Sequence, residues 1–101
     1  MATSKRSTIA ADVAETLAIQ ALAFLAGEPE SLGRFLAITG IGPEGIRDAA
    51  REPRFLAGVL EYLASDERLL VAFATQVGID PADVARACVA LGGQANDREP
   101  S

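Results

Sequence analysis

One short motif occurs twice in this sequence, and the repetition constrains the fold more than any other feature. Residues Gly40–Pro43 have the sequence GIGP, and Gly78–Pro81 have the sequence GIDP, 38 positions later. In each copy a hydrophobic run precedes the glycine, and another run of helical spacing follows the proline. Glycine is preferred just after a helix, and proline is favoured in the first turn of the next one. Each motif therefore predicts a corner between two consecutive helices.

The similarity at this offset extends beyond the corners. At nine positions the same residue occurs again 38 positions later. The pairs are Leu22 and Leu60, Leu25 and Leu63, Ala26 and Ala64, Leu32 and Leu70, Phe35 and Phe73, Gly40 and Gly78, Ile41 and Ile79, Pro43 and Pro81, and Ala49 and Ala87. We interpret the chain as two similar helical units, about residues 13–50 and 54–91, joined near Glu52–Arg54. Such units rarely bury their apolar faces alone, so they should pack against each other. Chance agreement between Ala- and Leu-rich helices is the alternative.

The composition favours an all-α fold. Hydrophobic residues make up 50% of the 101 positions, many of them alanine, with four phenylalanines and one tyrosine. Small side chains let helices approach closely, and β-branched residues are too sparse for a sheet of several strands. We predict a compact bundle of five or six helices in a single domain over residues 8–93. Residues 1–7 are predicted to be a flexible arm, and residues 94–101 a disordered tail.

Apolar residues at helical spacing predict which side of each helix is buried. The predicted inward positions, helix by helix, are Val13, Leu17, Ala21, Phe24 and Leu25; Leu32, Phe35, Leu36 and Thr39; Phe55, Leu56, Val59, Leu60 and Leu63; Leu69, Leu70, Phe73 and Val77; and Val84, Cys88 and Leu91. The first of these helices is apolar nearly all round and should be the most buried. Ile41 is expected to fold back onto Leu36 in a Schellman-type cap. A short, weak helix is expected at 43–50.

Charge, cysteine and histidine content exclude several classes of function. The net charge of −5 argues against a dominant nucleic-acid or anionic-membrane partner. The chain has no histidine, which removes the commonest general base and zinc ligand. Cys88 is the one cysteine, which suits a reducing compartment. The apolar run Leu17–Ala26 is interpreted as a core helix rather than a signal peptide or membrane span, and we expect a cytoplasmic protein.

We expect no catalytic, metal or cofactor site. Cys88 lies on the apolar side of the last predicted helix, with no histidine or nearby lysine to lower its pKa, so a buried, inert thiol is expected. The acidic pairs Asp66–Glu67 and Asp80–Asp83 fall at predicted helix starts, where capping accounts for them. No spacing resembles a calcium or zinc motif. The sequence therefore predicts a protein that is not an enzyme.

The sequence resembles a known protein family over nearly the whole chain, from Asp12 to Gly93. The segments that carry the likeness are AETLAIQALAFLAGEPESLGRFLAITGIGPEGIRDAA, FLAGVLEYLASDERLLVAFA and GIDPADVARACVALGG. They resemble a bacterial family of short proteins known as domain of unknown function 3572. Both corners occur in the same order as in the family. The resemblance implies a small helical cytoplasmic protein, and it implies no activity and no ligand residues.

The most plausible role is that of a protein–protein interaction module. Abundant large apolar residues on a small helical body predict an apolar groove between the two units, open to a partner helix or a second copy of the chain. We expect its exposed part to include Leu56, Val59, Tyr62 and Leu69, because the helix after Pro53 is apolar on more than one side.

The alternative is weak nucleic-acid binding through the glycine-rich corner at 40–43, which is similar to the hairpin of helix-hairpin-helix modules. Glu44 stands where a neutral or basic residue would help, and the second corner has Asp80 in place of a glycine. A helix-turn-helix interpretation would use helix 43–50 or 81–91 for recognition. Arg47, Arg51 and Arg54 form a modest basic cluster, although Asp48 and Glu52 are interleaved with it and we expect ordinary ion pairing along a solvated face.

Overall fold

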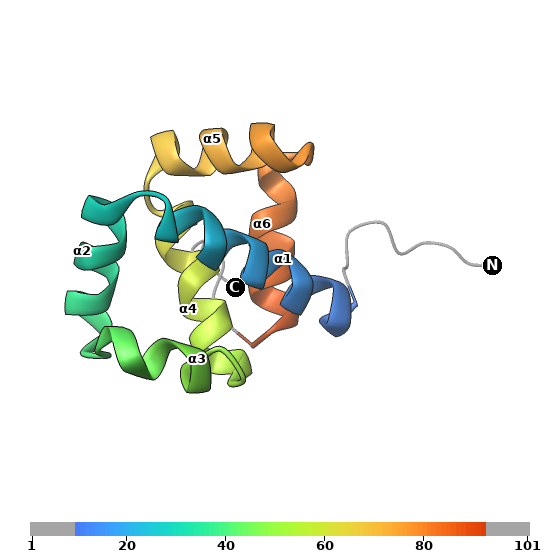
Figure 1. Cartoon of the computed structure of the whole chain (residues 1–101). Helices are drawn as coiled ribbons and strands as arrows, with labels where there is room; N and C mark the ends of the chain where they lie inside the picture. Colours follow the sequence, from blue (N-terminus) through green and yellow to red (C-terminus); the bar gives the residue numbers. More distant parts are fainter. Residues whose placement is uncertain (1–9, 93–101) are drawn as a thin grey trace, which may run out of the picture.

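The structure is a computed structural model that describes residues 10–92. Within that range the chain forms six α-helices and one 3₁₀ turn and no strand (Figure 1), which confirms the all-α class. The elements are α1 (Ala11–Ala26), α2 (Pro29–Thr39), η1 (Pro43–Gly45), α3 (Ile46–Ala49), α4 (Pro53–Ala64), α5 (Glu67–Val77) and α6 (Pro81–Ala90). The predicted arm at 1–7 and tail at 94–101 lie outside the described residues.

Three helices form the centre of the molecule. α1, α4 and α6 pack against one another, α2 packs on α1, and α5 packs on both α4 and α6. Figure 1 shows α5 crossing one end of this centre, with α2 and α3 on other sides of it. A single cluster of buried side chains extends from Ala14 to Leu91 and joins these helices. Helices α2 and α5 each contribute a buried phenylalanine to the cluster, Phe35 from α2 and Phe73 from α5.

The buried face of α1 differs from the predicted one. Its buried residues are Ala14, Leu17, Ala18, Ala21 and Leu25. Leu17, Ala21 and Leu25 were predicted correctly, whereas Val13 is 56% exposed, so its predicted burial is wrong. The physical reason is that three alanines let α1 approach α4 and α6 closely, and this rotates the adjacent valine away from the contact. The helix is therefore central, yet it keeps apolar side chains in contact with solvent.

Helix α6 is buried as its spacing predicts. Val84, Cys88 and Leu91 are 0%, 1% and 7% exposed and face α1 and α4. Its start is also as predicted. Asp80 accepts a hydrogen bond from the backbone N–H of Ala82 at 2.9 Å, and Asp83 accepts one from the N–H of Asp80 at 3.3 Å, which completes a capping box. Side-chain capping thus fixes where α6 begins.

Both glycine corners adopt the left-handed conformation, but they close differently. Gly40 and Gly78 each have a φ of 77°, and each donates its N–H to the carbonyl four residues earlier at 2.8 Å. Ile79 donates to the carbonyl of Ala74 at 2.9 Å, as in a Schellman motif, whereas Ile41 donates to the Thr39 hydroxyl at 3.4 Å. The Schellman closure predicted for Ile41 is therefore wrong. Thr39, predicted to face inward, is exposed and caps the helix instead.

Helix boundaries in the two predicted units correspond at the offset of 38. α2 spans Pro29–Thr39 and α5 spans Glu67–Val77, so both boundaries match, and α1 and α4 end at matching alanines. The third elements differ. Pro43 begins a 3₁₀ turn that is followed by the four-residue α3, in agreement with the weak helix expected at 43–50. Pro81 begins the ten-residue α6. Three-dimensional likeness of the two complete units stays a prediction.

Candidate functional site

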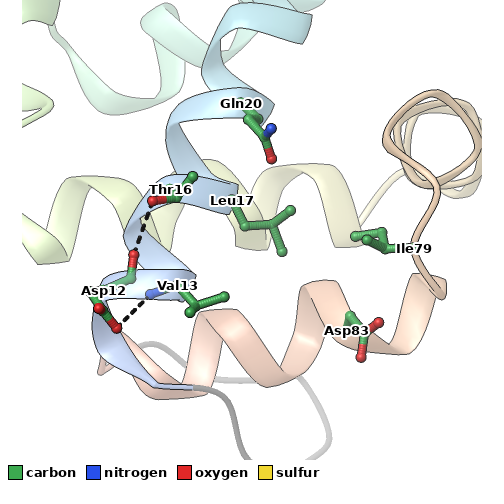
Figure 2. A pocket seen from close by; sticks show the side chains of 7 residues that line it. All are labelled: Asp12, Val13, Thr16, Leu17, Gln20, Ile79 and Asp83. Atoms are coloured by element: carbon green, nitrogen blue, oxygen red, sulfur yellow. Dashed lines mark hydrogen bonds between the residues drawn. The ribbon is translucent and has the colours of Figure 1, made fainter.

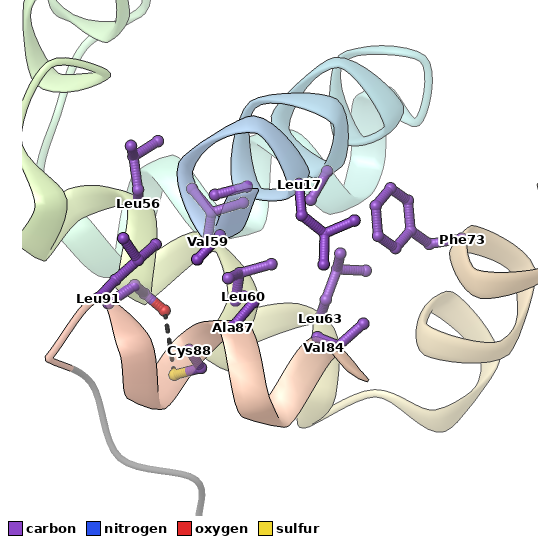
Figure 3. Close-up of a cluster of buried hydrophobic side chains, with 14 of the residues drawn as sticks. Leu17, Leu56, Val59, Leu60, Leu63, Phe73, Val84, Ala87, Cys88 and Leu91 are labelled. Atoms are coloured by element: carbon purple, nitrogen blue, oxygen red, sulfur yellow. Dashed lines mark hydrogen bonds between the residues drawn. The ribbon is translucent and has the colours of Figure 1, made fainter. Parts of the chain in front are cut away.

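The four residues predicted to form an exposed apolar surface do not form one. Leu56 and Val59 are 2% and 0% exposed and belong to the core drawn in Figure 3. Tyr62 and Leu69 are half-buried and pack against that core. The prediction is wrong because α4 packs against α1 and α6 and contacts α5 as well. Its apolar residues on more than one side match these several neighbours rather than a partner outside the chain.

An open groove lies between the two predicted units, at a different place. We call it the α1–α6 groove. It has a volume of about 560 Å³ and is lined by Asp12, Val13, Thr16, Leu17, Gln20, Ile79 and Asp83. Figure 2 shows that the first five of these residues come from α1, while Ile79 belongs to the corner before α6 and Asp83 to its first turn. A groove between the units was expected, but its lining was not.

The floor of the α1–α6 groove is apolar. Leu17 is buried beneath it, Ile79 is half-buried at one side, and Val13 is more than half exposed. Ile79 is held there by the left-handed Gly78 and by its own hydrogen bond to Ala74. The floor therefore combines a stripe of α1 with the Gly78–Ile79 corner, and Val13 stays more than half exposed on it.

The rim of the groove is polar and acidic. Asp12 Oδ1 accepts a hydrogen bond from the backbone N–H of Val13 at 2.9 Å, and the Thr16 hydroxyl donates to the carbonyl of Asp12 at 3.1 Å. On the opposite side Arg86 forms an ion pair with Asp83 at 2.6 Å. Gln20 completes the rim. Both carboxylates thus already serve helix starts, where backbone N–H groups and the helix dipole stabilise them.

The carboxylates of the groove stand at two separate helix starts. Asp12 and Asp83 come from different helices, and the side-chain partner recorded for them among residues 10–92 is Arg86, which pairs with Asp83. No group of three or more carboxylates or thiols that could hold a metal ion occurs among residues 10–92. The acids singled out elsewhere are caps: Asp66 accepts from the N–H groups of Arg68 and Leu69 at 3.1 and 3.3 Å. An apolar floor with a polar rim is typical of a protein-binding surface.

Cys88 lies apart from the groove, within the core. Its Sγ atom is 3.6 Å from the carbonyl oxygen of Ala57 and 3.9 Å from a carboxylate oxygen of Glu61. Burial, the negative charge of Glu61 and the hydrogen bond to it raise the pKa of Cys88 to about 11. The thiol is therefore protonated at neutral pH and is a poor nucleophile. Its predicted burial is confirmed.

The glycine-rich corner at 40–43 has a carboxylate beside it. A Cβ atom on Gly42 would meet a Glu44 carboxylate oxygen at 2.9 Å, so a negative charge stands at the corner itself. The following α3 has four residues, too few for a recognition helix. Arg47, Arg51 and Arg54, which follow this corner in the chain, are exposed.

The predicted pairing of these arginines with Asp48 and Glu52 is wrong. Between described residues, the ion pair within 4 Å is that of Arg86 with Asp83. The corner turns sharply between α3 and α4, because Pro53 begins a new helix. None of the three arginines stands four positions from Asp48 or Glu52, and only Asp48 and Arg51, at i,i+3, have a spacing that pairs along a helix. The arginines therefore remain solvated around the corner.

Comparison with protein-family models decides the family. The model described as "Protein of unknown function (DUF3572)" matches residues 11–94. The chain belongs to the DUF3572 family. The match begins with α1 and includes α6, so every residue that lines the α1–α6 groove lies within the DUF3572 region. Comparison with curated proteins and with solved structures gives no match.

Sequence reasoning missed the lining of the groove because it placed Val13 in the core. A usable signal was present: Ala14, Ala18 and Ala21 form a stripe of small residues at helical spacing, one position out of phase with Val13. Small residues mark the side of a helix that another helix approaches most closely. Ile79 was recognised only as a turn residue.

No helix among residues 10–92 of this DUF3572 protein is long and apolar enough to cross a bilayer.

Proposed function

We propose that this chain is a small, non-enzymatic protein of the cytoplasm that acts by binding another protein in the α1–α6 groove. The observation that carries the proposal is Val13, which is 56% exposed on the floor of a groove between α1 and α6. Leaving such a side chain in water forgoes the stabilisation that burial would give, about 25 cal/mol per Å² of apolar surface. A partner that covers the groove would recover it.

Two further observations support the proposal. The carboxylates around the groove form hydrogen bonds and an ion pair in the first turns of α1 and α6. They can therefore orient a partner, while these interactions leave them less available for catalysis. The cysteine, which is the strongest nucleophile type in the sequence, is buried and protonated. A single cysteine that forms no disulfide is also compatible with the reducing cytoplasm.

Variant-dependent capture from the native cell tests this function. The tagged protein is compared with Val13→Asp and with Ile19→Asp, a matched control on the same helix. Ile19 is 51% exposed but does not line the groove. We expect a discrete partner to be captured by the unmodified protein and by Ile19→Asp, and lost with Val13→Asp, because a carboxylate on the floor must be desolvated.

Circular dichroism on both variants is the necessary control, since each must keep the helical signal and melting temperature of the unmodified protein. Equal capture by all three proteins would contradict the use of the groove. Loss with both variants would point to general damage of α1 or to a second surface, and would equally count against it.

The nucleic-acid alternative loses support at its own site. Glu44 stands at the corner that would have to receive a phosphate, and the second corner carries the capping carboxylates of Asp80 and Asp83. The exposed Arg47, Arg51 and Arg54 are interleaved with acidic residues, so no strong field of one sign results. We therefore favour the protein partner.

A further inference from the structure

We propose that the partner segment bound by the α1–α6 groove is an amphipathic helix whose apolar stripe is flanked by lysine or arginine. The inference rests on the proposed function and adds the shape and the charge of the partner. Two features carry it: the spacing of the α1 residues in the lining, and the sign of the charge around them.

The lining residues of α1 form a helix-packing stripe. Val13, Thr16, Leu17 and Gln20 stand at positions i, i+3, i+4 and i+7, so they follow one side of α1 for two turns. At 1.5 Å per residue this stripe is about 10 Å long. Helices pack by placing such a stripe against the stripe of a neighbour. An added helix is thus the occupant that the lining of α1 matches in length and spacing.

The α5–α6 corner supplies the second wall. Ile79 faces the stripe from the corner, where Gly78 and a hydrogen bond to Ala74 fix its position. Figure 2 shows Ile79 and Asp83 across the groove from the α1 side chains. An occupant would therefore contact two elements at once, as the central helices of this molecule already do. The α1–α6 groove is already formed without a partner, which reduces the free-energy cost of binding.

The charge around the groove selects a cationic partner. The lining contains two carboxylates and no lysine or arginine, and α1 carries no basic residue from Ala11 to Ala26. Arg86 already offsets the charge of Asp83 at 2.6 Å. Asp12 has no cation within 4 Å among the described residues, and it is exposed. A lysine or arginine beside the apolar stripe of the partner would meet Asp12.

The test uses two hydrocarbon-stapled helical peptides with the same leucine stripe, one flanked by lysine and one by glutamate. Stapling is needed because short helices are marginal in water. Each peptide is titrated into the ¹⁵N-labelled full chain, and amide shifts are followed at low and at physiological salt. We expect the lysine peptide to shift the amides of Val13, Leu17 and Ile79 and to bind about fivefold or more tightly than the glutamate peptide. Added salt should reduce the difference in affinity between the two peptides.

Substitutions assign the charge effect to one residue. Asp12→Asn should weaken binding of the lysine peptide about two- to fivefold, the range for an exposed ion pair. Glu15→Gln is the matched control, because it removes a carboxylate from the same helix but outside the lining. This variant should bind the lysine peptide as tightly as the unmodified protein. Val13→Asp should abolish binding of both peptides.

Equal affinity for both peptides, or an Asp12→Asn variant that binds as tightly as the unmodified protein, would overturn the cationic partner. So would absence of binding, or shifts confined to residues outside the groove. The proposed function fails separately, when capture from the cell does not depend on Val13. These two results are therefore distinguishable.

Discussion

At the scale of single residues, two glycines set the path of the chain. Gly40 and Gly78 have the same φ of 77°, a conformation that other residues adopt only with strain. The residues beside them decide how each corner closes. Thr39 supplies a hydroxyl that accepts the N–H of Ile41, and at the matching position Val77 cannot, so Ile79 bonds to the backbone instead. The second closure directs Ile79 into the groove.

Alanine substitution should therefore have opposite effects at corner and helix glycines. Gly40→Ala and Gly78→Ala should each destabilise the protein by about 1–2 kcal/mol, because alanine is strained at positive φ. Gly33→Ala should stabilise it by about 0.5–1 kcal/mol, because Gly33 lies within α2 and a Cβ atom there meets nothing within 4 Å. Urea unfolding measures all three. Destabilisation of equal size at Gly33 would contradict this account.

At the scale of helices, α2 and α5 are anchored by reciprocal aromatic contacts. The Phe24 ring of α1 lies 5.6 Å from the Phe73 ring of α5, and the Tyr62 ring of α4 lies 5.4 Å from the Phe35 ring of α2. Phe24 and Tyr62 are 38 positions apart, as are Phe35 and Phe73. The second helix of each predicted unit thus places one aromatic ring against a ring from the first helix of the other unit, as reciprocal contact between two similar units would.

Double-mutant cycles test this reciprocity. The pair Phe24→Leu with Phe73→Leu, and the pair Phe35→Leu with Tyr62→Leu, should each show a coupling free energy of about 0.5–1.5 kcal/mol, typical of a tilted ring contact. Phe55 with Phe73, whose rings are not in contact, should be additive within about 0.5 kcal/mol. Coupling in only one of the two pairs would show that the contacts are not equivalent and would weaken the duplication hypothesis.

At the scale of the whole molecule, the sequence predicted elements better than surfaces. The corners, the boundaries of α2 and α5, the capped start of α6 and the burial of Cys88 follow from local rules of capping and spacing. Which side of α1 faces outward did not follow, because nearly every side of that helix is apolar. Only contact with α4 and α6 selects the alanine stripe and exposes Val13.

The same limit explains the misplaced interaction surface. Leu56 and Val59 are apolar in the sequence whether a partner or the core covers them, and three neighbouring helices cover them here. The groove depends on the Ile79 corner lying across from α1 (Figure 2), and these two elements are far apart in the chain. Local patterns do not encode such an arrangement.

The central claim is that the α1–α6 groove, and not another face of α1, receives a partner protein. Photo-crosslinking in the native cell tests it most directly, with a photoreactive amino acid placed at Gln20, which lines the groove, or at the adjacent Ile19, which does not. The account predicts a discrete crosslinked protein from position 20 and none from position 19. Crosslinks from position 19 alone, or the same product from both positions, would contradict it.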